Sequence, residues 1–109
     1  MRTLKFIVDN QIMKADPNCD FKNLVPGTKE YLRAEFSFSP EWNGFIKVAG
    51  FWSAMGYEYE PQLLVDGKTC VIPAEALARR SFKIQVLGKK GDAKLKTNKI
   101  ELIQNGGGV

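Results

Sequence analysis

The sequence predicts an all-β fold: an antiparallel β-sandwich of about eight strands with one short helix after Pro73. Three observations indicate this class. Apolar and polar residues alternate along most of the chain, which is the period of a strand with one buried face. Turn-forming residues separate the alternating segments. Helical character is confined to residues 73–79, where proline suits the first turn and three alanines favour a helix.

The N-terminal third predicts a hairpin followed by a loop. Leu4, Phe6 and Val8 alternate with Lys5 and Ile7, Asp9-Asn10 marks a turn, and residues 11–14 return along the first strand. The mixture of Pro, Asn, Asp and Gly in residues 15–29 is typical of a loop. The apolar residues expected to anchor this loop to the core are Phe21, Leu24 and Val25.

The clearest strand covers residues 32–38, where every even-numbered residue is apolar and every odd-numbered residue is polar. Residues 40–44 predict a turn that carries Trp42, and residues 45–52 predict the next strand. Gly50 interrupts the alternation of that strand. We therefore expect a β-bulge at this glycine.

The C-terminal half continues the pattern. Asp66-Gly67 predicts a two-residue hairpin between residues 62–65 and 68–72. Residues 82–86 alternate and predict a further strand, followed by a turn rich in glycine and lysine. The last strand is expected over residues 93–103, with a bulge or bend near Thr97-Asn98 because the apolar residues change faces there.

The length and composition are those of one domain. The chain has 109 residues, of which 44% are hydrophobic and 26% charged. We expect a single β-sandwich domain over residues 1–105 and a flexible Gly-rich tail over residues 106–109. No apolar run in the sequence is long enough to span a membrane, and the N-terminus lacks the apolar core of a secretory signal. The sequence therefore predicts a protein that is not secreted and has no membrane partner.

The residue types in the sequence give little support for a catalytic function. The chain contains no histidine, which excludes His-dependent triads and His-ligated zinc. Cys19 and Cys70 are too few for a zinc site; the sequence leaves their pairing open, although reduced thiols are favoured without a secretory signal. Glu58 and Glu60 fit a solvated strand face better than a glycosidase pair. We expect a protein that is not an enzyme and that has no cofactor and no metal.

Positive charge is concentrated in residues 79–99, which hold eight basic residues and a single acidic residue, Asp92. One hypothesis is a partner-binding stripe that meets an acidic protein surface or a phosphate backbone. The other is a set of lysines that guards an exposed edge strand against pairing. Nucleic acid is possible but not favoured, since no aromatic residues are interleaved for base stacking. The candidate basic stripe consists of Arg79, Arg80, Lys83, Lys89, Lys90, Lys94 and Lys96.

Aromatic residues gather between residues 42 and 59. Most are expected in the core, because large aromatic side chains dominate sandwich interiors. Phe51 and Trp52 are adjacent in a strand, so one of them faces outward unless both sides of the strand are covered. This predicts a second, aromatic contact patch of Trp52, Tyr57 and Tyr59.

Strand and turn segments from Tyr31 onward carry a resemblance to a known family. They are residues 31–39, Glu41-Trp42-Asn43-Gly44 with Lys47 and Phe51, residues 69–77, residues 82–88, and Thr97-Asn98. Their order resembles the N-terminal β-sandwich domain of bacteriophage and prophage baseplate upper proteins and tail fibres. The resemblance implies a domain that anchors a fibre or receptor-binding protein to the phage tail.

Three functions follow as hypotheses. The first is a non-enzymatic phage attachment module in the virion, acting by protein–protein contact in a tail or baseplate assembly, with a homo-oligomer as one form of that contact. The second is a small phage-encoded inhibitor of a host defence nuclease, similar to an anti-CRISPR protein, working in the bacterial cytoplasm through its basic surface. The third is a nucleic-acid-binding module.

Overall fold

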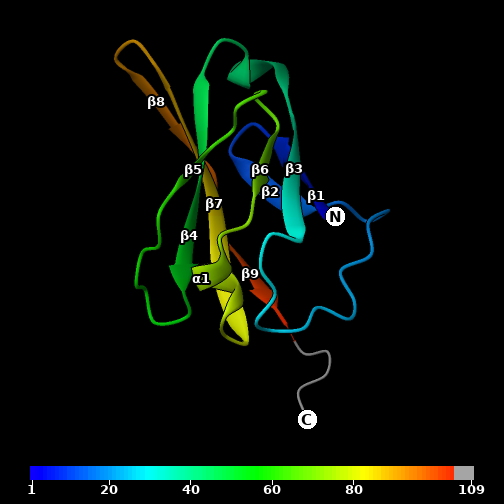
Figure 1. Ribbon diagram of the computed structural model, residues 1–109. Helices are drawn as coiled ribbons and strands as arrows, with labels where there is room; N and C mark the ends of the chain where they lie inside the picture. Colours follow the sequence, from blue (N-terminus) through cyan, green and yellow to red (C-terminus); the bar gives the residue numbers. More distant parts are fainter. Residues whose placement is uncertain (105–109) are drawn as a thin grey trace.

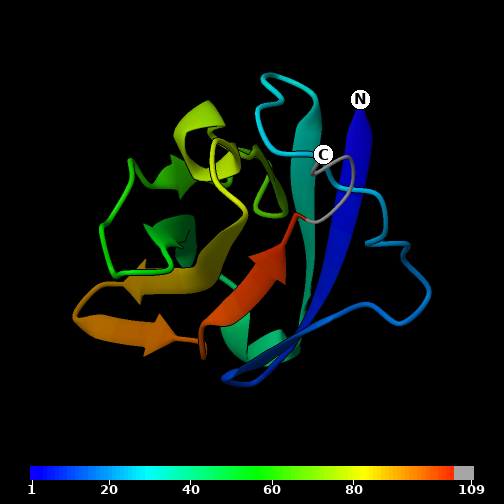
Figure 2. The ribbon, with the colours of Figure 1, turned by 90° about the horizontal axis from the view of Figure 1, so that it is seen from below.

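A computed structural model describes residues 1–104. Two β-sheets lie face to face and enclose the core (Figures 1 and 2), which confirms the predicted all-β, sandwich-like fold. Within the described residues the strands are β1 (Arg2–Asp9), β2 (Ile12–Ala15), β3 (Leu32–Phe38), β4 (Ile46–Ser53), β5 (Gln62–Leu63), β6 (Thr69–Val71), β7 (Ser81–Lys90), β8 (Ala93–Lys96) and β9 (Ile100–Ile103). The Gly-rich tail expected at residues 106–109 lies outside this range.

The first sheet has the order β2-β1-β3-β6, and the second has the order β5-β4-β7-β8. β9 also pairs with β7, at the end of β7 away from β8. One pairing departs from the antiparallel expectation: β1 and β3 run parallel, from Arg2↔Leu32 to Val8↔Phe38. Parallel neighbours need a long connection, and the hairpin strand β2 together with the loop that follows it provides one.

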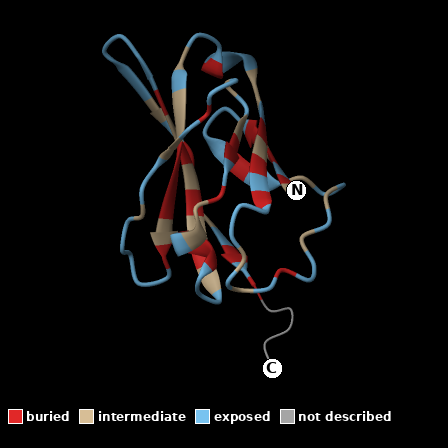
Figure 3. Ribbon diagram, viewed as in Figure 1, coloured by how far each residue is buried: buried red, intermediate tan, exposed pale blue. Residues whose placement is uncertain are grey.

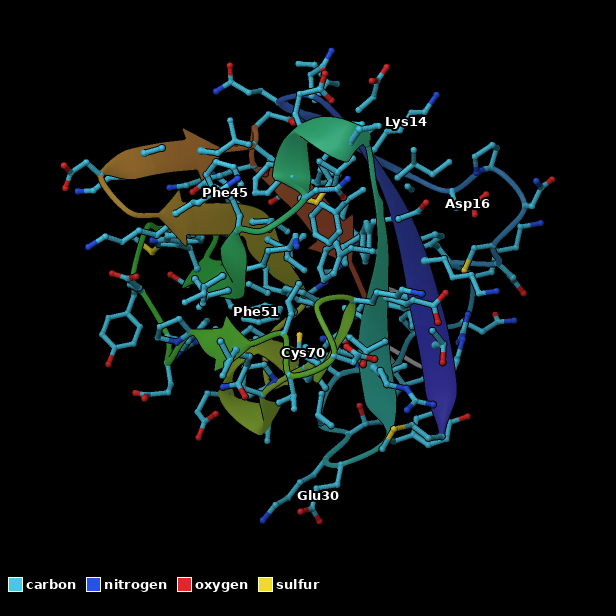
Figure 4. All side chains as sticks on the ribbon, turned by 90° about the horizontal axis from the view of Figure 1, so that it is seen from above. Lys14, Asp16, Glu30, Phe45, Phe51 and Cys70 are labelled. Atoms are coloured by element: carbon cyan, nitrogen blue, oxygen red, sulfur yellow. The ribbon has the colours of Figure 1, made fainter. Side chains whose placement is uncertain are left out.

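The core lies between the sheets, and its residues come from the predicted alternating strands. Phe82, Ile84 and Val86 of β7 are fully buried, as are Leu4 and Ala34 from the facing sheet. Figure 3 shows buried residues along the strands of both sheets, whereas the connecting turns are mostly exposed. In Figure 4, Phe51 and Cys70 point into this interior, whereas Lys14, Asp16 and Glu30 lie at its periphery. Alternation therefore predicts the inward faces correctly.

Two short helical turns join the strands. The first, η1 (Pro40–Trp42), places the predicted turn tryptophan in the core, where the Trp42 indole N–H donates to the Asn10 carbonyl at 2.6 Å. The second, α1 (Ala74–Leu77), is the predicted helix after Pro73, reduced to one turn. Among the described residues, no helix is long and apolar enough to cross a membrane.

The loop between β2 and β3 is anchored by two of the three expected residues. Leu24 is buried, and the Phe21 ring packs edge-on against Phe6 with centroids 5.5 Å apart. The prediction was wrong for Val25, which is 43% exposed. Neighbouring residues in an extended segment point to opposite sides, so the inward position of Leu24 turns Val25 toward solvent.

Asp66-Gly67 does not form the predicted hairpin. β5 pairs with β4 in the second sheet, while β6 pairs with β3 in the first, so this turn carries the chain between the sheets. The Asp66 carboxylate accepts hydrogen bonds from the backbone N–H groups of Lys68 and Thr69, at 2.9 and 2.7 Å. These bonds, with one from the Thr69 hydroxyl, lower the pKa of Asp66 to about 2.

The predicted bend at Thr97-Asn98 is confirmed, since β8 ends at Lys96 and β9 begins at Ile100. Thr97 stays attached to β7: its N–H donates to the Val86 carbonyl and its hydroxyl accepts from the Val86 N–H, both at 3.0 Å. The Asn98 side chain reaches the other sheet, accepting from the Met13 N–H at 2.6 Å and donating to the Met13 carbonyl at 3.1 Å. Thr97 and Asn98 form what we call the inter-sheet clasp.

Replacing Asn98 with alanine is expected to destabilise the protein by about 2 kcal/mol, because both backbone groups of Met13 lose their partner. Urea unfolding followed by circular dichroism measures this loss. Gln11→Ala is the matched control, since it removes only the single bond from the Gln11 amide to the Lys96 carbonyl. A loss for Asn98→Ala no larger than that of the control would show that the clasp contributes little.

Candidate protein-contact surfaces

The outer face of the second sheet carries an unusual mixture of side chains. Residues paired across the ladder share a face, so one row consists of Ile46, Lys89 and Lys94. The next row consists of Leu63, Val48, Leu87 and Lys96. The side facing away from the core is therefore apolar over β5, β4 and Leu87 of β7, and basic at Lys89, Lys94 and Lys96. We call these two rows the lysine-flanked face.

The apolar half of this face is open to solvent. Ile46 is 68% exposed, Leu63 is also exposed, and Val48 and Leu87 are half-buried. Ile46, Val48 and Leu87 line a shallow groove of about 330 Å³ together with the neighbouring lysines, and Leu63 lies beside it as the partner of Val48. The solvent face of an antiparallel sheet is normally polar. Exposed apolar residues grouped in this way are typical of a contact surface.

The basic half places like charges side by side. Lys89 and Lys94 are directly paired across β7 and β8, and both are exposed. Like charges in this position repel and destabilise a sheet. Lys96 extends the cluster along β8, in the hairpin that extends away from the first sheet in Figure 1. The positive potential here favours an acidic partner.

Trp52 lies on the same side of the sheet but is not available as a flat contact surface. Its ring covers Gly50, where an added Cβ would lie 2.5 Å from the ring, and the Lys99 ammonium lies 4.2 Å from the ring centroid. The predicted bulge at Gly50 is wrong, because the β4–β7 register is continuous from Ile46↔Lys89 to Ser53↔Phe82. This position requires glycine because the tryptophan ring occupies the space of a side chain.

The predicted basic stripe is not one surface. Lys83, Lys89, Lys94 and Lys96 share the outer side of the second sheet, with Lys83 in the same row as Trp52. The Lys90 ammonium turns toward the Phe45 ring, 6.0 Å from its centroid. Strand alternation explains this difference between Lys89 and Lys90. Arg79 and Arg80 lie in the connection between α1 and β7, at the opposite end of the strand.

The predicted aromatic patch is also divided. An isolated bridge pairs Trp52 with Glu58, so Tyr57 and Tyr59 on either side of Glu58 point to the other side of the chain. The two tyrosine rings pack edge to face with centroids 5.4 Å apart. They line a groove that also contains Arg79 and Arg80. Two residues of each predicted patch thus belong to a groove that the sequence did not indicate.

The sequence reasoning missed the apolar half of the lysine-flanked face. A signal was present, because residues 45–52 contain more apolar residues than one buried face can hold. Gly50 within this segment predicts a bulge instead. The exposed Ile46 and half-buried Val48 show that the excess reflects apolar side chains on both sides of β4.

The cysteines remain free thiols, half-buried at Cys19 and buried at Cys70. Burial raises the pKa of the Cys70 thiol to about 12, with the nearby negative charge of Asp66 acting in the same direction. Cys70 is therefore a protonated core residue at neutral pH. Within residues 1–104, no three Cys, Asp or Glu side chains lie together in a group suited to a metal ion.

Comparisons with protein-family models, with curated proteins and with solved structures gave no match to this chain. The resemblance to phage tail and baseplate domains stays a prediction.

Gly50→Ala is expected to displace the Trp52 ring and to destabilise the protein by about 1–2 kcal/mol, the usual cost of overpacking. In a Trp52→Ala background the same change should be neutral or slightly stabilising, because alanine restricts the unfolded chain. Urea unfolding of the four proteins in this cycle gives both values. An equal cost of Gly50→Ala in both backgrounds would contradict the packing explanation.

Proposed function

We propose that this chain is a non-enzymatic attachment module that acts by protein–protein contact in the tail or baseplate assembly of a bacteriophage. The lysine-flanked face carries the proposal. Its apolar half offers Ile46 and Leu63 for burial against a partner, and its lysines border that half on one side. An apolar centre with a charged rim is the arrangement expected of a protein interface. The resemblance of the sequence to phage attachment domains is the reason for proposing a tail or baseplate assembly.

The guarded-edge hypothesis accounts for only part of this face. Lysines on β8 protect an edge strand from pairing with another chain. They give no reason for Ile46 and Leu63 to stay exposed beside them. A contact surface explains both features, since the partner covers the apolar residues and neutralises the paired charges of Lys89 and Lys94.

Nucleic acid fits this face less well. Single strands are bound by aromatic side chains on which bases stack. On this side of the sheet the aromatic ring of Trp52 is half-buried against Gly50 and in contact with Lys99. A duplex would contact the lysines through its phosphates but would leave the apolar half uncovered.

The lysine cluster favours a second candidate. An inhibitor of a host defence nuclease would use the same lysines to occupy an acidic surface of that enzyme. The directly paired Lys89 and Lys94 support this alternative, because an acidic partner relieves their repulsion.

The test is the content of purified virions of the phage or prophage that encodes the chain, measured by quantitative mass spectrometry. The attachment function predicts the protein at a fixed copy number per particle. Ile46→Asp together with Leu63→Asp should remove it from the particles, because a charge enters the apolar half of the contact. Both residues are exposed, so the fold is expected to persist.

Ile12→Asp is the matched control, since Ile12 is similarly exposed but belongs to the other sheet. It should leave incorporation unchanged. Absence of the wild-type protein from virions would contradict the attachment function. A stable complex with a host nuclease in that case would establish the second candidate.

A further inference from the structure

We propose that a second site, the Tyr–Arg groove, binds an extended peptide segment that places a carboxylate beside an apolar side chain. The groove has a volume of about 740 Å³, which is in the size range of peptide and small-ligand sites. It lies between the connection that follows β4 and the connection between α1 and β7. Its lining includes Met55, Tyr57, Tyr59, Glu75, Arg79 and Arg80.

The groove is separate from the lysine-flanked face. Its walls begin at Ser53 and end at Ser81, which is one end of the β4–β7 pair. The lysine-flanked face is centred on Ile46 and Lys89, at the other end. The site therefore does not depend on the function proposed above.

The tyrosine wall is held in place by backbone bonds. Two hydrogen bonds join Ser53 and Tyr57: the Ser53 N–H donates to the Tyr57 carbonyl at 2.8 Å, and the Ser53 side-chain hydroxyl accepts from the Tyr57 N–H at 3.0 Å. The Tyr59 N–H donates to the Phe51 carbonyl at 2.8 Å. Tyr57 is nevertheless 70% exposed and Met55 is 97% exposed. Apolar side chains are thus presented to solvent on a fixed backbone.

The arginine wall is fixed by Gln104, whose side chain is buried. Its amide nitrogen donates to the carbonyls of Leu77 and Arg79, at 3.0 and 2.8 Å. The Gln104 N–H also donates to the Arg80 carbonyl at 2.6 Å. These bonds immobilise the backbone of Arg79 and Arg80 while both side chains remain exposed. A preordered wall of this kind lowers the entropy cost of binding.

The residue types define the occupant. Guanidinium groups bind carboxylates through paired hydrogen bonds, so Arg79 and Arg80 favour an Asp, a Glu or a terminal carboxylate. Tyr57, Tyr59 and Met55 offer the apolar contact, and Tyr, Met and Arg are enriched at protein interfaces.

The acidic side chains near the groove determine the direction in which a peptide binds. Glu75 also lines the groove, and Glu58 and Glu60 line an adjoining depression together with Tyr57, Tyr59 and Glu75. A polyanion such as a nucleic acid would meet these three carboxylates. A peptide with its acidic residues toward the arginines and a lysine or amide toward the glutamates avoids that repulsion and matches both ends.

The test is an NMR titration of the full chain, labelled with ¹⁵N, with the N-acetylated and C-amidated peptide DDLFQK. Saturable shifts are expected in the amides of Tyr57, Tyr59, Arg79 and Arg80. The charge-reversed peptide KKLFQD should produce none. Arg79→Glu with Arg80→Glu should weaken binding by about tenfold or more, since attraction becomes repulsion. Lys14→Glu is the control, since Lys14 is exposed on β2 outside both surfaces, and it should leave peptide binding unchanged.

Several outcomes would overturn the site. They are an absence of groove shifts with DDLFQK, equal shifts with both peptides, or shifts that the arginine variants leave intact. Groove shifts that depend on protein concentration without peptide would instead assign the groove to a second copy of this chain. None of these outcomes bears on incorporation into virions, so the two proposals fail separately.

Discussion

The inter-sheet clasp is the constraint on which the rest of the molecule depends. A sandwich needs its two sheets to meet at a fixed separation and angle, and apolar packing alone is not directional. The Asn98 side chain adds directional hydrogen bonds to both backbone groups of Met13 in β2, as a neighbouring strand would. Thr97, one residue earlier, bonds both backbone groups of Val86 in β7. Two adjacent residues thereby fix one strand of each sheet relative to the other.

Both candidate surfaces follow from the position of this clasp. On one side of it, β8 pairs with the end of β7 and places Lys94 beside Lys89. On the other side, β9 pairs with the start of β7 and leads to Gln104, which holds the arginine wall of the Tyr–Arg groove. The register changes by one residue between Leu87↔Lys96 and Ile84↔Ile100, so a strand continuing past residue 96 in the register of β8 would turn the side chains of β9 to the opposite face. The bend therefore allows one segment to contribute to both candidate surfaces.

Local sequence patterns predicted the strands that have one buried and one exposed face, because such strands alternate apolar and polar residues. Residues 32–38 and 82–86 alternate because one face is buried, and the change of face at Thr97-Asn98 indicated the bend. The pairing of strands that are distant in the sequence was harder to predict from local patterns. Asp66-Gly67 has the chemistry of a tight turn whether it joins paired strands or two sheets, and nothing local indicates that β1 and β3 run parallel. The sequence predicts Arg80 in one patch with Lys83 and Tyr57 in another patch with Trp52. The pairing of distant strands instead brings Arg80 and Tyr57 to the same groove, and local sequence does not determine that pairing.

Native-state hydrogen exchange at the amides of Met13 and Val86 tests the clasp most directly. Both amides donate to clasp side chains, Met13 to Asn98 and Val86 to Thr97. If the clasp joins the sheets, both amides exchange only when the whole protein unfolds, with the free energy obtained from urea denaturation. Rapid exchange at Met13, while the amides of β1 and β7 stay protected, would show that the sheets are held together without it.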